Sequence, residues 1–204
     1  MPEFAPDAIT KQVIEDIQES AGVGSIDGFN YAVTHAGAER ALVDFVSNRL
    51  ENFGTYEDAM TKRDGHLFHA ILSPYLNIGL LTPMQVIDAV ERAYYEKDAP
   101  LNSVEGFVRQ VMGWREYMYW QYWQLMPDLA EQNHWNAQRP VPQMFWDGKT
   151  DMNCIKHIVT RLLGTGYSHH IERLMVISNF YLLAGIQPQA LLDWVKAFYI
   201  DAYD

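Results

Sequence analysis

Three short segments of the chain combine ionisable or hydroxyl side chains with aromatic ones. Residues 113–120 read Gly-Trp-Arg-Glu-Tyr-Met-Tyr-Trp, and residues 166–175 read Gly-Tyr-Ser-His-His-Ile-Glu-Arg-Leu-Met. Residues 72–79 place a Ser-Pro break inside apolar sequence. Each segment also has a plain structural reading, because aromatic side chains at helical spacing commonly fill a core. None of the three identifies a site by itself.

The histidines do not form a convincing metal site. His169 and His170 are adjacent, so their side chains diverge by about 100° on a helix. His66 and His69 lie three residues apart, with no Glu or Cys at the usual zinc spacing. Glycine-rich phosphate loops and the nucleophile elbow are also missing from the sequence. Hydrolase and Rossmann-type readings therefore find no support.

The composition sets further bounds on function. The 204 residues carry a formal net charge of −11, which disfavours tight, sequence-independent binding to nucleic acid. Cys154 is the only cysteine, so an internal disulfide is impossible and a cytoplasmic setting is favoured. The sequence offers no apolar run long enough to cross a membrane, and its N-terminus does not resemble a signal peptide.

Helical periodicity and capping residues predict that these segments lie on a succession of α-helices. No stretch alternates with a period of two, so we expect little or no β-sheet and a multi-helix bundle. The last helix reaches Asp204 without a stop signal, which predicts a shortened form of a longer polypeptide. We expect helices to begin near these positions: Gly37, Asp64, Pro83 after a Thr82 cap, Ser103, Thr150, Ser168 and Pro188.

Taken in order, the three segments resemble the photolyase and cryptochrome superfamily, and most closely its bacterial iron–sulfur branch that repairs (6-4) photoproducts. The resemblance runs from about Phe29 to Asp204. Six segments carry it: residues 52–60, residues 72–79, Trp114-Arg115-Glu116-Tyr117, residues 150–154, residues 167–175 and residues 198–204. It implies one partial, all-α FAD-binding domain over residues 1–204, without the antenna domain and the cluster-binding segment of the family.

The resemblance implies that FAD is the cofactor and indicates which residues hold it. A diphosphate needs hydroxyl and amide donors and a cation, which Ser73 near a helix start and Arg115 can supply. The alternative is purely structural: Ser73 only caps a helix, and Arg115 only forms an ion pair on the helix face that carries Glu116. The full set of expected FAD-binding residues is His69, Ser73, Gln110, Arg115, Arg173 and Asp201.

The resemblance implies that DNA is repaired by light-driven electron transfer from the flavin to the lesion. The (6-4) reaction also needs a proton donor. His170 occupies the position of the family's essential histidine, with His169 as its neighbouring helper, and a histidine can donate a proton near neutral pH. The second histidine of other (6-4) enzymes is replaced here by Leu174. Arg173 and Asp201 match a family salt bridge beside the flavin.

Trp146 and Trp194 match electron-relay positions, although plain core tryptophans would look the same. Cys154 matches the first of four cysteines that hold the branch's [4Fe–4S] cluster. With one cysteine, this chain alone cannot bind that cluster.

The resemblance therefore predicts a photolyase-related lyase that acts on UV-damaged DNA, with this fragment inactive by itself. Two rival readings remain: a cryptochrome-like photoreceptor that signals instead of repairing, and a helical fragment without FAD. A base-sized pocket beside His170 would favour repair, because a lesion must flip out of the duplex to reach the flavin.

Overall fold

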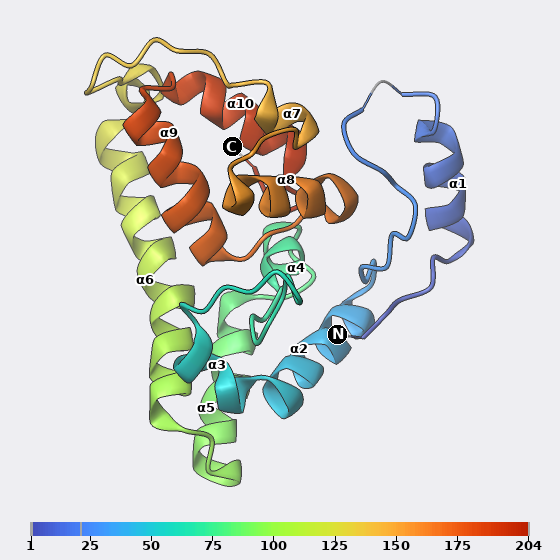
Figure 1. Ribbon diagram of the computed structural model, residues 1–204. Helices are drawn as coiled ribbons and strands as arrows, with labels where there is room; N and C mark the ends of the chain where they lie inside the picture. The colour runs from blue at the N-terminus through green and yellow to red at the C-terminus, as the bar shows by residue number, and fades with distance from the viewer. Residues whose placement is uncertain (1, 21, 204) are drawn as a thin grey trace. The chain divides into compact units, whose positions relative to one another are not determined.

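The computed structural model describes residues 2–20 and 22–203, and its regular structure is helical (Figure 1). Within those residues, β pairing is limited to one isolated parallel bridge between Arg139 and Ile186. The predicted all-α fold is therefore confirmed. The chain divides into two compact units, one formed by Met1–Glu57 and Phe68–Trp114, the other by Asp58–Leu67 and Arg115–Asp204. The prediction that residues 1–204 form one domain stays a prediction.

The first unit is built from helices whose starts are set by capping side chains. Asp7 and Thr34 accept backbone hydrogen bonds at the starts of the first two helices, and Thr82 forms a reciprocal capping box with Gln85 before Pro83. The helices of this unit are α1 (Ala8–Ile17), α2 (His35–Asn48), α3 (Leu50–Tyr56), α4 (Ser73–Asn77), α5 (Pro83–Lys97) and the first part of α6 (Leu101–Leu125).

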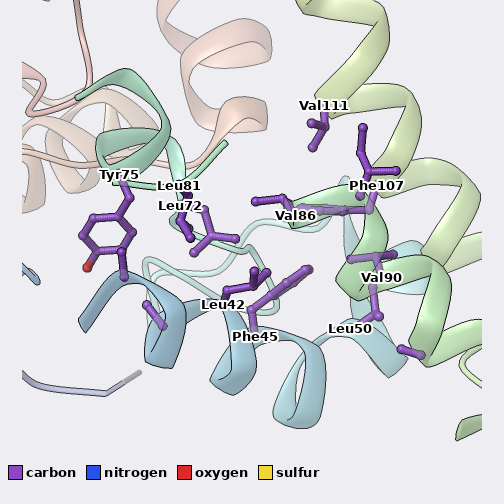
Figure 2. Close-up of a cluster of buried hydrophobic side chains, with 14 of the residues drawn as sticks. Leu42, Phe45, Leu50, Leu72, Tyr75, Leu81, Val86, Val90, Phe107 and Val111 are labelled. Carbon is purple, nitrogen blue, oxygen red and sulfur yellow. The ribbon is translucent and has the colours of Figure 1, made fainter. Parts of the chain in front are cut away.

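An aromatic cluster joins α2, α3 and α6 in the core of this unit. The ring of Phe45 lies 4.7 Å from that of Phe107, and the ring of Phe53 lies 5.4 Å from Phe107 (centroid distances). Apolar side chains of α5, including Val86 and Val90, are also fully buried in this cluster (Figure 2). Each buried side chain of this size stabilises the fold by roughly 2 kcal/mol.

A glycine lets α3 approach α6 closely. A Cβ on Gly54 would lie 2.6 Å from the backbone of Asn102 and Ser103, a distance that real side chains do not tolerate. The Ser103 hydroxyl accepts a hydrogen bond from the Gly54 amide at 2.9 Å and donates one to the Glu51 carbonyl at 3.1 Å. Ser103 is therefore a buried link between the two helices, and α6 begins two residues before it, where we had expected Ser103 to be the cap.

The second unit surrounds a core centred on Trp194. This side chain is fully buried and donates a hydrogen bond to the Phe145 carbonyl at 3.0 Å. Apolar residues of α8 and α10 pack around it, as their helical periodicity predicts. The elements are the end of α6, η1 (Asp128–Glu131), α7 (Met144–Asp147), α8 (Asn153–Thr165), the π-helix η2 (Glu172–Ser178), α9 (Asn179–Ala184) and α10 (Pro188–Phe198).

Two expected helix starts were wrong. No helix begins at Asp64: residues 61–72 form turns, with Leu67 and Ile71 at positive φ (47° and 55°), a backbone conformation that a right-handed helix cannot contain. Thr150 accepts a hydrogen bond from the amide of Met152 instead of capping a helix, and α8 begins at Asn153. Apolar spacing alone could not reveal either departure.

Candidate functional site

The expected FAD-binding residues are divided between the two units. His69, Ser73 and Gln110 belong to the first unit, whereas Arg115, Arg173 and Asp201 belong to the second. Each group is described within its own unit.

In the first unit, the three expected residues lie in different surroundings. His69 is buried, with its ring edge-on to Phe53 at 6.0 Å. Ser73 is the first residue of α4, which has only five residues and so contributes little of the helix field invoked for phosphate binding. The Gln110 side-chain oxygen accepts a hydrogen bond from Trp114 at 2.6 Å. Ser73 therefore offers its hydroxyl, but not a long helix, to an anion.

In the second unit, the predicted Arg173–Asp201 ion pair is present. Nη1 of Arg173 lies 2.9 Å from Oδ1 of Asp201, and Nη2 donates to Oδ2 at 3.1 Å. The guanidinium also lies over the rings of Tyr199 (4.2 Å) and Tyr167 (5.2 Å). The Arg173 guanidinium is thus held by three side chains, those of Asp201, Tyr199 and Tyr167. Arg115 is half-buried, and its burial lowers the pKa of its guanidinium.

The two histidines differ in burial, as expected for adjacent positions. His169 is fully buried, and its burial, followed by the neighbouring charges of His170, Arg161 and Arg173, lowers its pKa to about 4. His170 is half-buried; burial lowers its pKa, with Asp58 acting in the opposite direction and Arg173 in the same one. His169 is therefore neutral at pH 7, while His170 keeps access to solvent.

The two tryptophans belong to one run of aromatic contacts. The ring of Trp146 lies 5.5 Å from Phe198, which stacks on Trp194 at 4.9 Å. Trp194 in turn lies 5.9 Å from Tyr199, the residue under the Arg173 guanidinium. Trp146 is 41% exposed whereas Trp194 is fully buried, so the run leads from the surface of this unit to the ion pair.

Cys154 is a free, exposed thiol on the first turn of α8. It lies on the wall of an open pocket of about 240 Å³ whose other lining residues include Lys62, His157, Arg161 and Glu172. No group of three or more His, Cys, Asp or Glu side chains suited to a metal ion occurs among the residues described. Nor does any helix in the described ranges have the length and apolar character needed to cross a membrane.

Comparison with known proteins shows which proteins this chain resembles. Over its whole length, the chain is 47% identical to a (6-4) photolyase of Agrobacterium fabrum and covers 40% of that protein. It is also 31% identical over 129 residues to the uncharacterized protein R853 of Acanthamoeba polyphaga mimivirus, a match that covers 63% of this chain and 92% of the viral protein. The chain belongs to the photolyase and cryptochrome superfamily. No family model matches it.

Solved structures confirm the superfamily fold. A bacterial class III photolyase from Agrobacterium tumefaciens matches with a TM-score of 0.69 at 21% identity, over 83% of this chain and 35% of that one. A Synechocystis cryptochrome matches with a TM-score of 0.73 at 18% identity, over all of this chain and 39% of that one. The chain thus spans about two fifths of the length of the photolyase and cryptochrome chains it resembles.

Sequence reasoning missed two residues that support the histidine pair. Arg161 of α8 pairs with Glu172, and both side chains are largely buried (18% and 4% exposed). The signal was present: Arg161 lies between the apolar positions Ile158 and Leu162, and Glu172 follows the buried Ile171. A charged residue among apolar positions of a helix suggests burial. Two of opposite sign, Arg161 and Glu172, could therefore have been identified as a buried pair.

Proposed function

We propose that this chain is the FAD-binding part of a photolyase-related enzyme that repairs (6-4) photoproducts in UV-damaged DNA. The observation that carries the proposal is the Arg173–Asp201 ion pair between two tyrosine rings, next to the turn that holds His170. The 47% identity to a (6-4) photolyase favours repair over photoreceptor signalling, since the likeness to a cryptochrome extends to the fold alone.

The donor set fits FAD. A dinucleotide carries an anionic diphosphate, and each unit offers a residue type that suits such an anion: the Ser73 hydroxyl in the first unit and the Arg115 guanidinium in the second. Arg173, held by Asp201, offers a fixed positive charge that favours an anionic flavin ring by Coulomb attraction. When bound, FAD supplies an electron donor that light activates. The [4Fe–4S] cluster of the branch does not fit this chain alone, because Cys154 offers one thiolate where four are needed.

We assign two tasks to the chain's own residues and place the protein in a compartment. His170, half-buried and three residues before Arg173, donates a proton to the lesion; an approaching DNA phosphate would favour its cationic form. The aromatic run from Trp146 through Trp194 to Tyr199 passes electrons inward from the surface of the second unit. The single cysteine suits a reducing compartment, so we place the protein in the cytoplasm.

A thermal shift with FAD tests cofactor binding directly. A ligand at 100 times its Kd stabilises the folded state by about 2.7 kcal/mol, which raises Tm by roughly 5–10 °C in a chain of this size. Arg173→Ala should abolish most of this rise, whereas Arg92→Ala, on an exposed face of α5, should retain it. An equal rise in both variants would remove Arg173 from the site, and no rise in the unmodified chain would contradict FAD binding.

Repair can be tested in the full-length context of the relative. In a chimera, residues 1–204 would replace the matching segment of the Agrobacterium (6-4) photolyase. We expect His170→Ala to keep flavin absorbance but to lose repair of (6-4) lesions, and His169→Gln to be milder. Repair at the unmodified rate in the His170 variant would refute its catalytic assignment and leave FAD binding untouched.

A further inference from the structure

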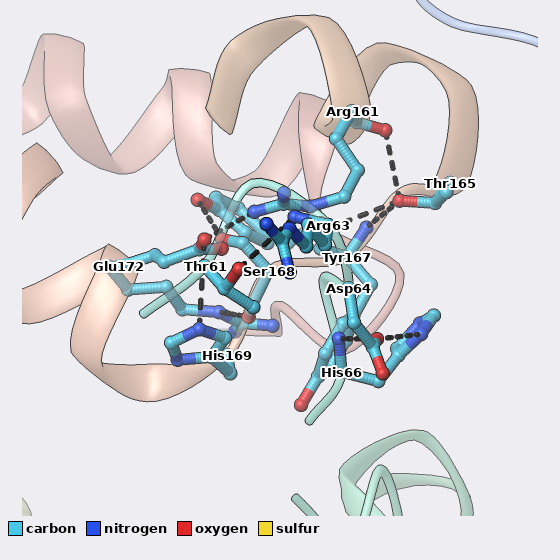
Figure 3. A network of polar contacts seen from close by, with 12 residues as sticks. Thr61, Arg63, Asp64, His66, Arg161, Thr165, Tyr167, Ser168, His169 and Glu172 are labelled. Carbon is cyan, nitrogen blue, oxygen red and sulfur yellow. Dashed lines mark hydrogen bonds and ion pairs between the residues drawn. The ribbon is translucent and has the colours of Figure 1, made fainter. Parts of the chain in front are cut away.

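The turn that carries the histidine pair is held from two sides. On one side, Arg173 pairs with Asp201 and donates from Nε to the Ser168 carbonyl at 2.6 Å. On the other side, Glu172 pairs with Arg161 of α8, and its Oε1 lies 3.6 Å from Nε2 of His169 (Figure 3). Only the first side is accounted for by the FAD site.

Glu172 is an ionisable residue in a buried position. Its side chain is 4% exposed, and burial raises its pKa, an effect that the hydrogen bond and the charge of Arg161 oppose. Its second oxygen accepts no hydrogen bond from any residue that the structure describes. A buried ion pair often stabilises a fold less than apolar residues of the same size would. Stability alone therefore gives a weak reason for a carboxylate here.

The surroundings of Arg161 keep the pair in one place. Gly65 lies against the Arg161 side chain, and any Cβ at that position would collide with it. The next residue, His66, stacks on Tyr167 with its ring centroid 5.7 Å away. The Thr165 hydroxyl donates to the Arg161 carbonyl at 3.0 Å and accepts from the Tyr167 amide at 3.3 Å. Arg161 and Tyr167, which lies just before the histidine pair, therefore share contacts with Thr165 and with the Gly65–His66 segment.

We infer that Glu172 is a positioning residue for His170. The carboxylate pairs with Arg161 and packs against the His169 ring at 3.6 Å, and a fixed His169 fixes the backbone from which the next residue, His170, projects. His170 then keeps a single side-chain orientation within reach of the Arg173 charge. The inference rests on the proposed function only in taking His170 as the group to be oriented.

The orientation of His170 can be measured in this chain without FAD. With histidine labelled by ¹³C and ¹⁵N, three-bond couplings and line widths report its χ1 rotamer in the NMR spectrum. We expect one dominant rotamer in the unmodified chain, loss of that preference in Glu172→Gln, and partial recovery in Glu172→Asp, which keeps the charge. Gly65→Ala should also disorder His170, because it displaces Arg161 while leaving both charges in the sequence.

A matched control separates positioning from stability. Ser103→Ala removes two buried hydrogen bonds in the first unit and should lower Tm without changing the His170 rotamer. An unchanged rotamer in folded Glu172→Gln and Gly65→Ala would overturn the inference. If the rotamer is lost but FAD raises no Tm in the unmodified chain, the positioning stands and the proposed function fails. The two failures are therefore distinguishable.

Discussion

The burial of His169 makes the protein sensitive to acid in a way that can be calculated. The folded state lowers the pKa of this side chain from 6.5 to about 4, chiefly because no solvent reaches the ring. A histidine with a lowered pKa contributes its full stability above the unfolded pKa and loses it as the pH falls through the window from 6.5 to 4. In that window the unfolded chain binds a proton that the folded chain refuses.

The linkage relation gives the size of the loss. Between pH 7 and pH 5 the free energy of unfolding should fall by about 2 kcal/mol on account of His169, and below pH 4 the loss should level off near 3 kcal/mol. This is a large share of the stability of an ordinary domain.

Urea unfolding at pH 7 and pH 5, followed by circular dichroism, measures this loss. His169→Gln cannot take up a proton, so its stability should fall by about 2 kcal/mol less than that of the unmodified chain over the same interval. His134→Gln, at an exposed position, should behave like the unmodified chain. The reasoning fails if the unmodified chain and His169→Gln lose equal stability between the two pH values.

Two further predictions concern the buried polar groups. Arg161→Met leaves the Glu172 carboxylate buried without its cation, so we expect a loss of about 3 kcal/mol at pH 7. That loss should shrink as the pH falls, because Glu172 already has a raised pKa and can become neutral; thermal melts at pH 8 and pH 5 would show it, and an identical loss at both would contradict it. Ser103→Ala leaves the Gly54 amide without its acceptor and should cost about 1–2 kcal/mol in urea unfolding, whereas Ser47→Ala, on the exposed side of α2, should cost less than about 0.5 kcal/mol.

The sequence was sufficient to predict several of the helices and one ion pair of the candidate site. The Thr82 cap, the Pro188 start and the apolar stripe of α8 depend on neighbouring residues, so local physics specifies them. The Arg173–Asp201 pair was predicted through the family resemblance, because nothing in the local sequence joins residues 28 positions apart.

What the sequence could not give depends on long-range packing. The turns of residues 61–72 contain leucine and isoleucine in left-handed backbone, which only surrounding contacts can impose. Likewise, Leu174 and Met175 are apolar residues of a helical segment but are about half exposed, and they lie in η2, which is wound as a π-helix. Periodicity assumes 3.6 residues per turn and fails where the winding changes.

The path of the chain between its two units has a consequence for biosynthesis. Residues 58–67 belong to the second unit but are made long before Arg161 and Tyr167, their partners there. At ordinary rates of translation this segment waits roughly 5–20 seconds on the ribosome before its neighbours emerge. A single protease cut in this segment would therefore release neither unit whole, because each is composed of two separate stretches of chain.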